Sequence, residues 1–95
     1  MISKKNSILI KLDKKAAKEL KKLSKDIQAK IKQKIKTLCD NPLAGKQLSG
    51  FPPLRRIRSG NYRIIYTFQD NILVILVLNI GHRKDIYRNL KQQKQ

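Results

Sequence analysis

The spacing of hydrophobic positions changes along the chain, from a helical period in the first half to a strand period in the second. Residues 7–12 form a short apolar run with β-branched members, which predicts an opening strand directly before Asp13. Asp13 suits a helix cap, and apolar side chains then recur three or four residues apart. Ser24 begins a second such pattern, which should stop at Asn41-Pro42. Two amphipathic helices are therefore expected, forming a hairpin with one apolar side.

After a loop at residues 41–53, alternating and then almost continuous hydrophobic positions predict three strands, at residues 55–58, 62–68 and 72–80. The continuous run of the last strand is typical of an interior position. Residues 59–61 and the pair Asp70-Asn71 have the composition of hairpin turns. The expected fold class is α+β, with a small antiparallel sheet in the order β-α-α-β-β-β. The helical hairpin should pack on one sheet face, in a single domain spanning residues 1–95. A short C-terminal helix is allowed, and residues 91–95 should form a frayed tail.

Charge narrows the possible partners. The chain has 23 Lys and Arg against 6 Asp and Glu, a formal net charge of +17 on 95 residues. Such a surface attracts nucleic acid, anionic lipid or an acidic protein, and charge alone does not choose among them. The lysine-rich helix faces are most simply solvated surfaces. Cys39 is the only cysteine, which excludes an internal disulfide framework and a multi-cysteine zinc site. With no apolar run of membrane-spanning length and no signal-peptide pattern, a cytoplasmic protein is expected.

Strand alternation brings several cations together. If Ile64 faces the helices, Arg63 must face the other side of the sheet, where no apolar segment remains to cover it. By the same period, Arg56 and Arg58 share one face of the preceding strand. The break at Gly81 releases His82 and Arg83 at the end of the last strand. One exposed arginine is ordinary, but this group beside a histidine favours a phosphate-binding site.

Two motifs then carry a resemblance to a known family. They are GNYRIIY at residues 60–66 and GHRKDIY at residues 81–87, within the order strand, lysine-rich helical hairpin, NPLAGKQLSG loop and strand pair. This arrangement resembles the RelE branch of the RelE/ParE superfamily of bacterial toxins over nearly the whole chain. The resemblance implies a ribonuclease that cuts messenger RNA in the ribosomal A site. It also implies an acidic antitoxin partner and no cofactor or metal.

The resemblance also assigns site residues. Arg63 matches the strand arginine that contacts the scissile phosphate, and Arg83 the arginine that stabilises transition-state charge. Tyr87 matches a tyrosine that handles the nucleophile's proton or its hydrogen bonding. Leu54 and Arg56 stand where better-studied members carry two lysines, and His82 stands where a lysine can occur. The catalytic set is therefore Arg63, Arg83, His82 and Tyr87. The residues expected to bind RNA or phosphate are Lys46, Arg55, Arg56, Arg58, Lys84 and Arg88.

The reaction suggested is attack of the ribose 2′-hydroxyl on the adjacent phosphate, without a metal. Arginines would stabilise the growing negative charge, each well-placed donor contributing about 3–4 kcal/mol. Proton transfer would fall to His82 and Tyr87, because arginine stays protonated and histidine exchanges protons near neutral pH. Which of the two is the base stays open. Two alternatives remain: a ParE-like inhibitor of DNA gyrase, and a module that binds RNA without cutting it.

Overall fold

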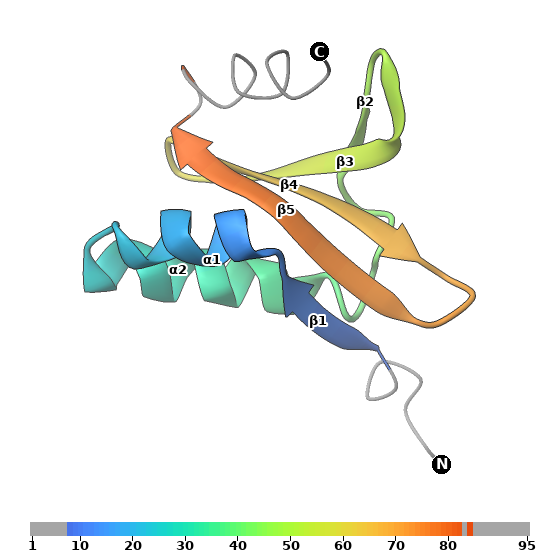
Figure 1. The fold of residues 1–95 in the computed structure, drawn as a ribbon, viewed down its shortest axis with the longest axis horizontal. Coiled ribbons are helices and arrows are strands. Elements are labelled where there is room, and N and C mark those ends of the chain that lie inside the picture. The colour runs from blue at the N-terminus through green and yellow to red at the C-terminus, as the bar shows by residue number, and fades with distance from the viewer. Residues whose placement is uncertain (1–7, 83, 85–95) are drawn as a thin grey trace.

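The computed structural model describes residues 8–82 and 84, and shows two helices packed on one face of a five-stranded sheet (Figure 1). Its elements in chain order are β1 (Leu9–Leu12), α1 (Lys14–Lys21), α2 (Lys25–Thr37), β2 (Lys46–Leu48), β3 (Phe51–Ser59), β4 (Tyr62–Gln69) and β5 (Val74–His82). The α+β class and the predicted order of elements are confirmed. β2 is an additional strand, inside the segment that the sequence predicts as a loop. The expected C-terminal helix and frayed tail lie outside the described residues.

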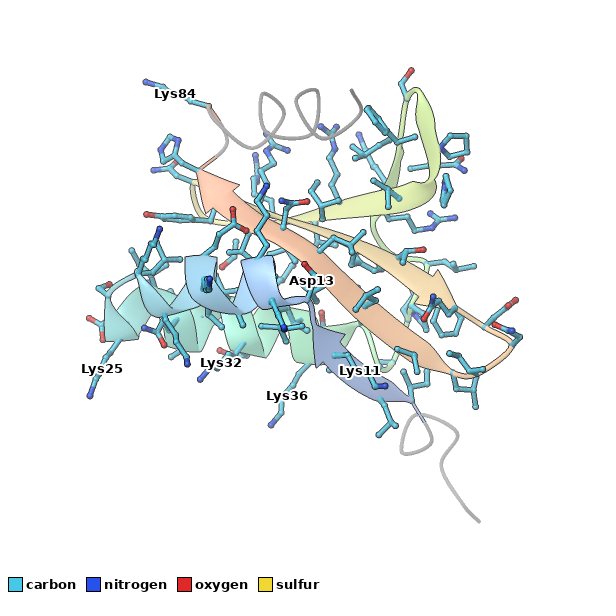
Figure 2. The ribbon with its side chains drawn as sticks, in the orientation of Figure 1. Lys11, Asp13, Lys25, Lys32, Lys36 and Lys84 are labelled. Carbon is cyan, nitrogen blue, oxygen red and sulfur yellow. The ribbon has the colours of Figure 1, made fainter. Side chains whose placement is uncertain are left out.

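Both helices begin where the capping residues predict. Asp13 accepts a hydrogen bond from the Lys15 N–H at 3.3 Å, and Ser24 accepts one from the Ile27 N–H at 3.4 Å. α2 ends at Thr37, a few residues before the predicted stop, and the chain continues in turns to Asn41. Figure 2 shows Lys25, Lys32 and Lys36 on the side of α2 away from the sheet, which agrees with a solvated helix face.

The sheet has the strand order β1-β5-β4-β3-β2 and is mixed, not fully antiparallel. β2 to β5 pair antiparallel through their connecting turns. β1 instead pairs parallel with β5, Leu9 opposite Val74 and Leu12 opposite Val77. No hairpin joins these two strands, since the helices and three strands lie between them in the chain. β5 therefore has a neighbour on each side, as its continuous hydrophobic run predicts.

One of the two predicted hairpin turns has the predicted position, and the other is longer than predicted. Gly60 and Asn61 join β3 to β4, and Gly60 has a φ of +61°, which glycine adopts at low cost. The turn between β4 and β5 is longer than the predicted Asp70-Asn71 pair, because β5 begins only at Val74. Leu73 closes this turn with a φ of +54°, and its carbonyl accepts a hydrogen bond from the Leu9 N–H at 3.0 Å. That bond ties the turn to the edge strand β1.

The core lies between the helices and the sheet. Its buried members come from both helices and from β3, β4 and β5: Ala16, Leu20, Ile31, Ile35, Leu38, Ile57, Ile64, Tyr66, Ile75, Val77 and Ile80. A smaller cluster forms on the opposite sheet face, where Leu48 and Ile65 are buried against Phe51 and Leu54. The expectation that nothing apolar covers that face is therefore wrong at the β2–β3 end. No helix among the described residues is long and apolar enough to cross a membrane.

Candidate nucleic-acid interface

A cationic groove opens where the end of α2 meets β2, β3 and β4. Its volume is about 570 Å³, which is within the usual size range of ligand pockets. Five basic side chains line it, from four different elements: Lys34, Lys46, Arg56, Arg58 and Arg63. Thr37, Leu38, Ala44 and Ile57 complete the wall. A concave site with this lining is suited to a phosphate-bearing ligand.

The strand register places these cations directly opposite one another. Lys46 pairs with Arg56 across β2 and β3, and Arg58 pairs with Arg63 across β3 and β4. Like charges at directly opposed positions of a sheet destabilise it. The Arg58–Arg63 pair therefore represents unfavourable electrostatic energy that a bound anion would reduce.

Within residues 8–82 and 84, two buried donors on the same side of the sheet have no hydrogen-bond partner. Among the described residues, the buried side-chain nitrogens that make no hydrogen bond are Arg63 Nε and Asn79 Nδ2. Asn79 pairs with Ile65 on β4, two positions from Arg63, so both side chains belong to the same face. Asn79 is only 1% exposed. Leaving a buried donor unpaired costs about 1–3 kcal/mol, so such donors are rare in folded proteins.

The loop between α2 and β2 is held against the sheet by two side chains. The Tyr66 hydroxyl donates to the Pro42 carbonyl at 2.7 Å and accepts from the Gly45 N–H at 3.0 Å. Arg55 Nη1 donates to the Gly45 carbonyl at 2.8 Å. Burial raises the pKa of the Tyr66 phenol, while the hydrogen bond from Gly45 and the charge of Arg55 act in the opposite direction. These contacts hold the start of β2 in place, and with it Lys46, which lines the groove.

The fit of the loop also requires glycine at position 45. A Cβ there would lie 2.6 Å from the Arg56 carbonyl oxygen and 2.8 Å from the Tyr66 ring. Backbone and ring therefore approach too closely for any side chain.

Comparison with known proteins identifies the family. A family model described as the ParE toxin of type II toxin–antitoxin systems matches residues 10–87. The chain belongs to this toxin family. A RelE-like toxin protein of Escherichia coli is 34% identical over 90 residues, covering 90% of this chain and 94% of the relative. The mRNA interferase toxin RelE of Escherichia coli K12 is 31% identical over 75 residues, covering 76% of this chain and 79% of that protein.

The fold gives the same result. A chain of the RelBE2 toxin–antitoxin complex from Mycobacterium tuberculosis superposes with a TM-score of 0.73 at 26% identity, over 81% of this chain and 99% of that one. Sequence and structure together place the chain in the RelE-like branch of the RelE/ParE superfamily. The resemblance carried by the two sequence motifs is confirmed, and the chain is a RelE-like toxin of the type II class.

The groove gathers four of the basic residues that the sequence predicts for phosphate binding or catalysis: Lys46, Arg56, Arg58 and Arg63. Arg55 is not among them. It pairs with Tyr66, whose side chain lies in the core on the helix side of the sheet, and its guanidinium is engaged by the loop. Successive residues of a strand point to opposite faces, so Arg55 and Arg56 are separated by the sheet.

His82 lies at the end of β5, opposite Tyr62, while Gly81 is the residue opposite Arg63. Its ring contacts that of Tyr62 edge to face, with centroids 5.8 Å apart. Its Nδ1 accepts a hydrogen bond from the Lys84 N–H at 3.2 Å. Figure 2 shows the Lys84 side chain extending outward beyond β5. Strand alternation thus puts His82 and Arg63 on different faces. Arg83, Tyr87 and Arg88 lie outside the described residues.

Three groove or near-groove residues are absent from the sequence prediction. Lys34 and Thr37 reach the groove from the last turns of α2, and nothing in the helical pattern distinguishes Lys34 from the other lysines. Asn79 could have been noticed in the sequence, because it is the one amide in the aliphatic run of residues 72–80. Leu54, where the sequence resemblance would place a lysine, packs in the small apolar cluster with Ile65.

Proposed function

We propose that this toxin is a metal-independent endoribonuclease that cleaves messenger RNA, within the ribosomal A site, and that an acidic antitoxin neutralises it. Support comes from the relative named mRNA interferase toxin RelE and from the RelBE2 structural neighbour, which is a toxin–antitoxin complex. The observation that carries the proposal is the groove in which Arg58 faces Arg63 and Lys46 faces Arg56. It matches the charge of a nucleic-acid backbone.

In the proposed reaction, the ribose 2′-hydroxyl attacks the adjacent phosphorus and the bond to the 5′-oxygen breaks. A 2′,3′-cyclic phosphate and a 5′-hydroxyl end result. Arg63 is proposed to hold the scissile phosphate, with Arg56 and Arg58 beside it and Arg83 stabilising the charge that develops on the non-bridging oxygens. Guanidinium groups suit this task because they stay charged and donate in a fixed, planar geometry.

Proton transfer is proposed for Tyr87 and His82. The Lys84 N–H occupies Nδ1 of His82, so Nε2 is the ring nitrogen proposed to take part in proton transfer, and which of His82 and Tyr87 is the base stays open. Lys84 and Arg88 are proposed to contact RNA outside the groove.

The test is reconstituted translation of a defined message with purified toxin, followed by primer extension to map cleavage. Codon-phased cuts are expected with the wild-type chain. Arg63→Ala should slow cleavage by about 10²–10³-fold, the usual effect of removing one donor to transition-state charge. Lys25→Ala is the matched control, since it also removes one positive charge but lies on the outer side of the helices. It should cut like the wild type.

Two results would contradict the proposal. If the message stays intact while DNA gyrase accumulates DNA breaks, the chain is the ParE-like inhibitor, which the description of the matching family model favours. If RNA is bound but never cut, and Arg63→Ala weakens binding only slightly, the chain is a binding module.

A further inference from the structure

β5 contains a bulge just before the part of the strand that faces Arg63. Ile65 of β4 pairs with Asn79 and the next residue, Tyr66, pairs with Val77, so Leu78 is an extra residue in β5. On the N-terminal side of the bulge Val77 faces the helices, and on its C-terminal side Ile80 does so, three positions later. A regular strand would not place both in the same core.

The bulge decides which residues of β5 share the face of the groove. With it, Asn79 and Gly81 lie opposite Ile65 and Arg63, and His82 lies opposite Tyr62. A shift of one residue would exchange the two sets between the faces of the sheet. It would also expel Ile80 from the core, where it is 1% exposed. The pairing register of β5 after Leu78 therefore determines which of its residues lie on the groove's side of the sheet.

A carboxylate from α1 holds this register. Glu19 Oε1 accepts a hydrogen bond from the backbone N–H of Ile80 at 2.8 Å, although the two residues are 61 positions apart. β1 pairs with β5 only as far as Leu12 and Val77, after which the chain turns into α1. The Ile80 N–H thus points to the edge where β1 has ended, and the half-buried Glu19 takes the place of a strand acceptor. Bonds to a charged acceptor are stronger than neutral ones.

We propose that Glu19 is a positioning residue of the nuclease site, which acts by locking the bulged register of β5 and so placing Gly81 and His82 relative to Arg63. Its side chain lies on the helix side of the sheet and touches no proposed substrate atom. The effect on cleavage rests on the proposed function, whereas the effect on the register does not. The experiment therefore has one readout for each.

The register is read by NMR on the uniformly labelled toxin. Glu19→Ala and Glu19→Asp, whose carboxylate is one methylene shorter, are expected to accelerate hydrogen exchange of the Ile80 amide about tenfold or more, because a partly buried hydrogen bond is lost. Both should weaken the cross-strand contacts between Arg63 and Gly81. Glu19→Gln keeps an acceptor at the same reach and should preserve them. Gln28→Ala is the matched control: it also loses a side-chain bond to a backbone group, to the Leu23 carbonyl at 2.8 Å, but at the turn between the helices.

The second readout is cleavage kinetics. Glu19→Ala should lower kcat on the order of 10-fold to 100-fold with KM within about threefold, because misplacement of reacting groups affects the chemical step. Glu19→Gln should restore most of kcat, and Gln28→Ala should leave it unchanged. If Glu19→Ala does not fold, the comparison of Glu19→Asp with Glu19→Gln replaces it.

The proposal is overturned if Ile80 exchange and the Arg63–Gly81 contacts are the same in Glu19→Asp and in the wild type, or if Glu19→Gln behaves like Glu19→Asp. A changed register with unchanged kcat also overturns it. Absence of cleavage by the wild-type toxin would defeat the proposed nuclease function alone, since the NMR readout would still report whether Glu19 sets the register.

Discussion

Replacing Tyr66 by Phe removes one oxygen atom from the core and two hydrogen bonds from the loop that leads into the groove. The hydroxyl is bonded to the Pro42 carbonyl at 2.7 Å and to the Gly45 N–H at 3.0 Å. The ring is fully buried, and the phenylalanine ring would keep the same packing. The substitution therefore isolates the polar contribution of this residue.

The expected loss follows from the two backbone groups that would be left unpaired. Each buried, unsatisfied polar group costs about 1–3 kcal/mol, and the Pro42 side of the loop is partly exposed, so its carbonyl should lie at the lower end. We expect the free energy of unfolding to fall by about 2–4 kcal/mol. That is a large share of the roughly 5–15 kcal/mol that stabilises a typical domain.

The assay is urea denaturation followed by far-ultraviolet circular dichroism, which does not depend on the tyrosine that is changed. The midpoint should fall by about 1–2 M with an unchanged slope, since the surface exposed on unfolding is the same. Tyr62→Phe is the matched control, because within residues 8–82 and 84 its ring packs against the core and His82 while its hydroxyl makes no hydrogen bond. It should change the free energy of unfolding by less than about 0.5 kcal/mol. A loss below about 0.5 kcal/mol in Tyr66→Phe, or an equal loss in both variants, would refute the reasoning.

Three further outcomes are expected. Because the pKa of Tyr66 is raised in the folded chain, chiefly by burial, its stabilising contribution is complete below the unfolded value near 10 and is lost as pH rises through the folded value. The difference in stability between the wild type and Tyr66→Phe should thus narrow above about pH 10, and a constant difference would contradict it. Asn79→Leu should leave the free energy of unfolding unchanged or raise it by about 1 kcal/mol, since it removes a buried donor without a partner among the described residues. A lower stability in thermal or urea unfolding would show that the Asn79 amide has a partner. Gly45→Ala should lower the free energy of unfolding by about 1–3 kcal/mol in the same urea assay, because its Cβ would lie 2.6 Å from the Arg56 carbonyl oxygen. A variant as stable as the wild type would show that the loop can move to accommodate the methyl group.

Local patterns in the sequence were sufficient to predict the two helices and the main strands. Asp13 and Ser24 begin the helices as their capping chemistry predicts, and the alternation around Arg63 correctly separates it from Ile64. These features depend on neighbours a few residues apart, which the sequence shows directly. Likewise Tyr66, which shares its period with Ile64, is a core residue.

The errors arose where distant segments meet. β2 is a short strand whose residues Lys46–Leu48 show no apolar alternation of their own and are defined by pairing with β3. The parallel pairing of β1 and the bulge at Leu78 likewise depend on contacts across the fold. The bulge explains why alternation counted along β5 could not predict the face of His82. The role of Glu19 could not be predicted from local patterns, because it bonds to a residue 61 positions away.

The departure at Leu54 clarifies how the groove is built. A lysine at this position would lie on the groove's side of β3, but Leu54 instead joins Leu48, Phe51 and Ile65 in a small apolar cluster. Part of the open face is thereby removed from water, which strengthens the electrostatic interactions of the adjacent guanidinium groups. Those groups keep their charge at any working pH, so they can stabilise an anion but cannot exchange a proton. The guanidinium groups of the groove therefore supply charge, and in the proposed reaction the proton is transferred by other side chains.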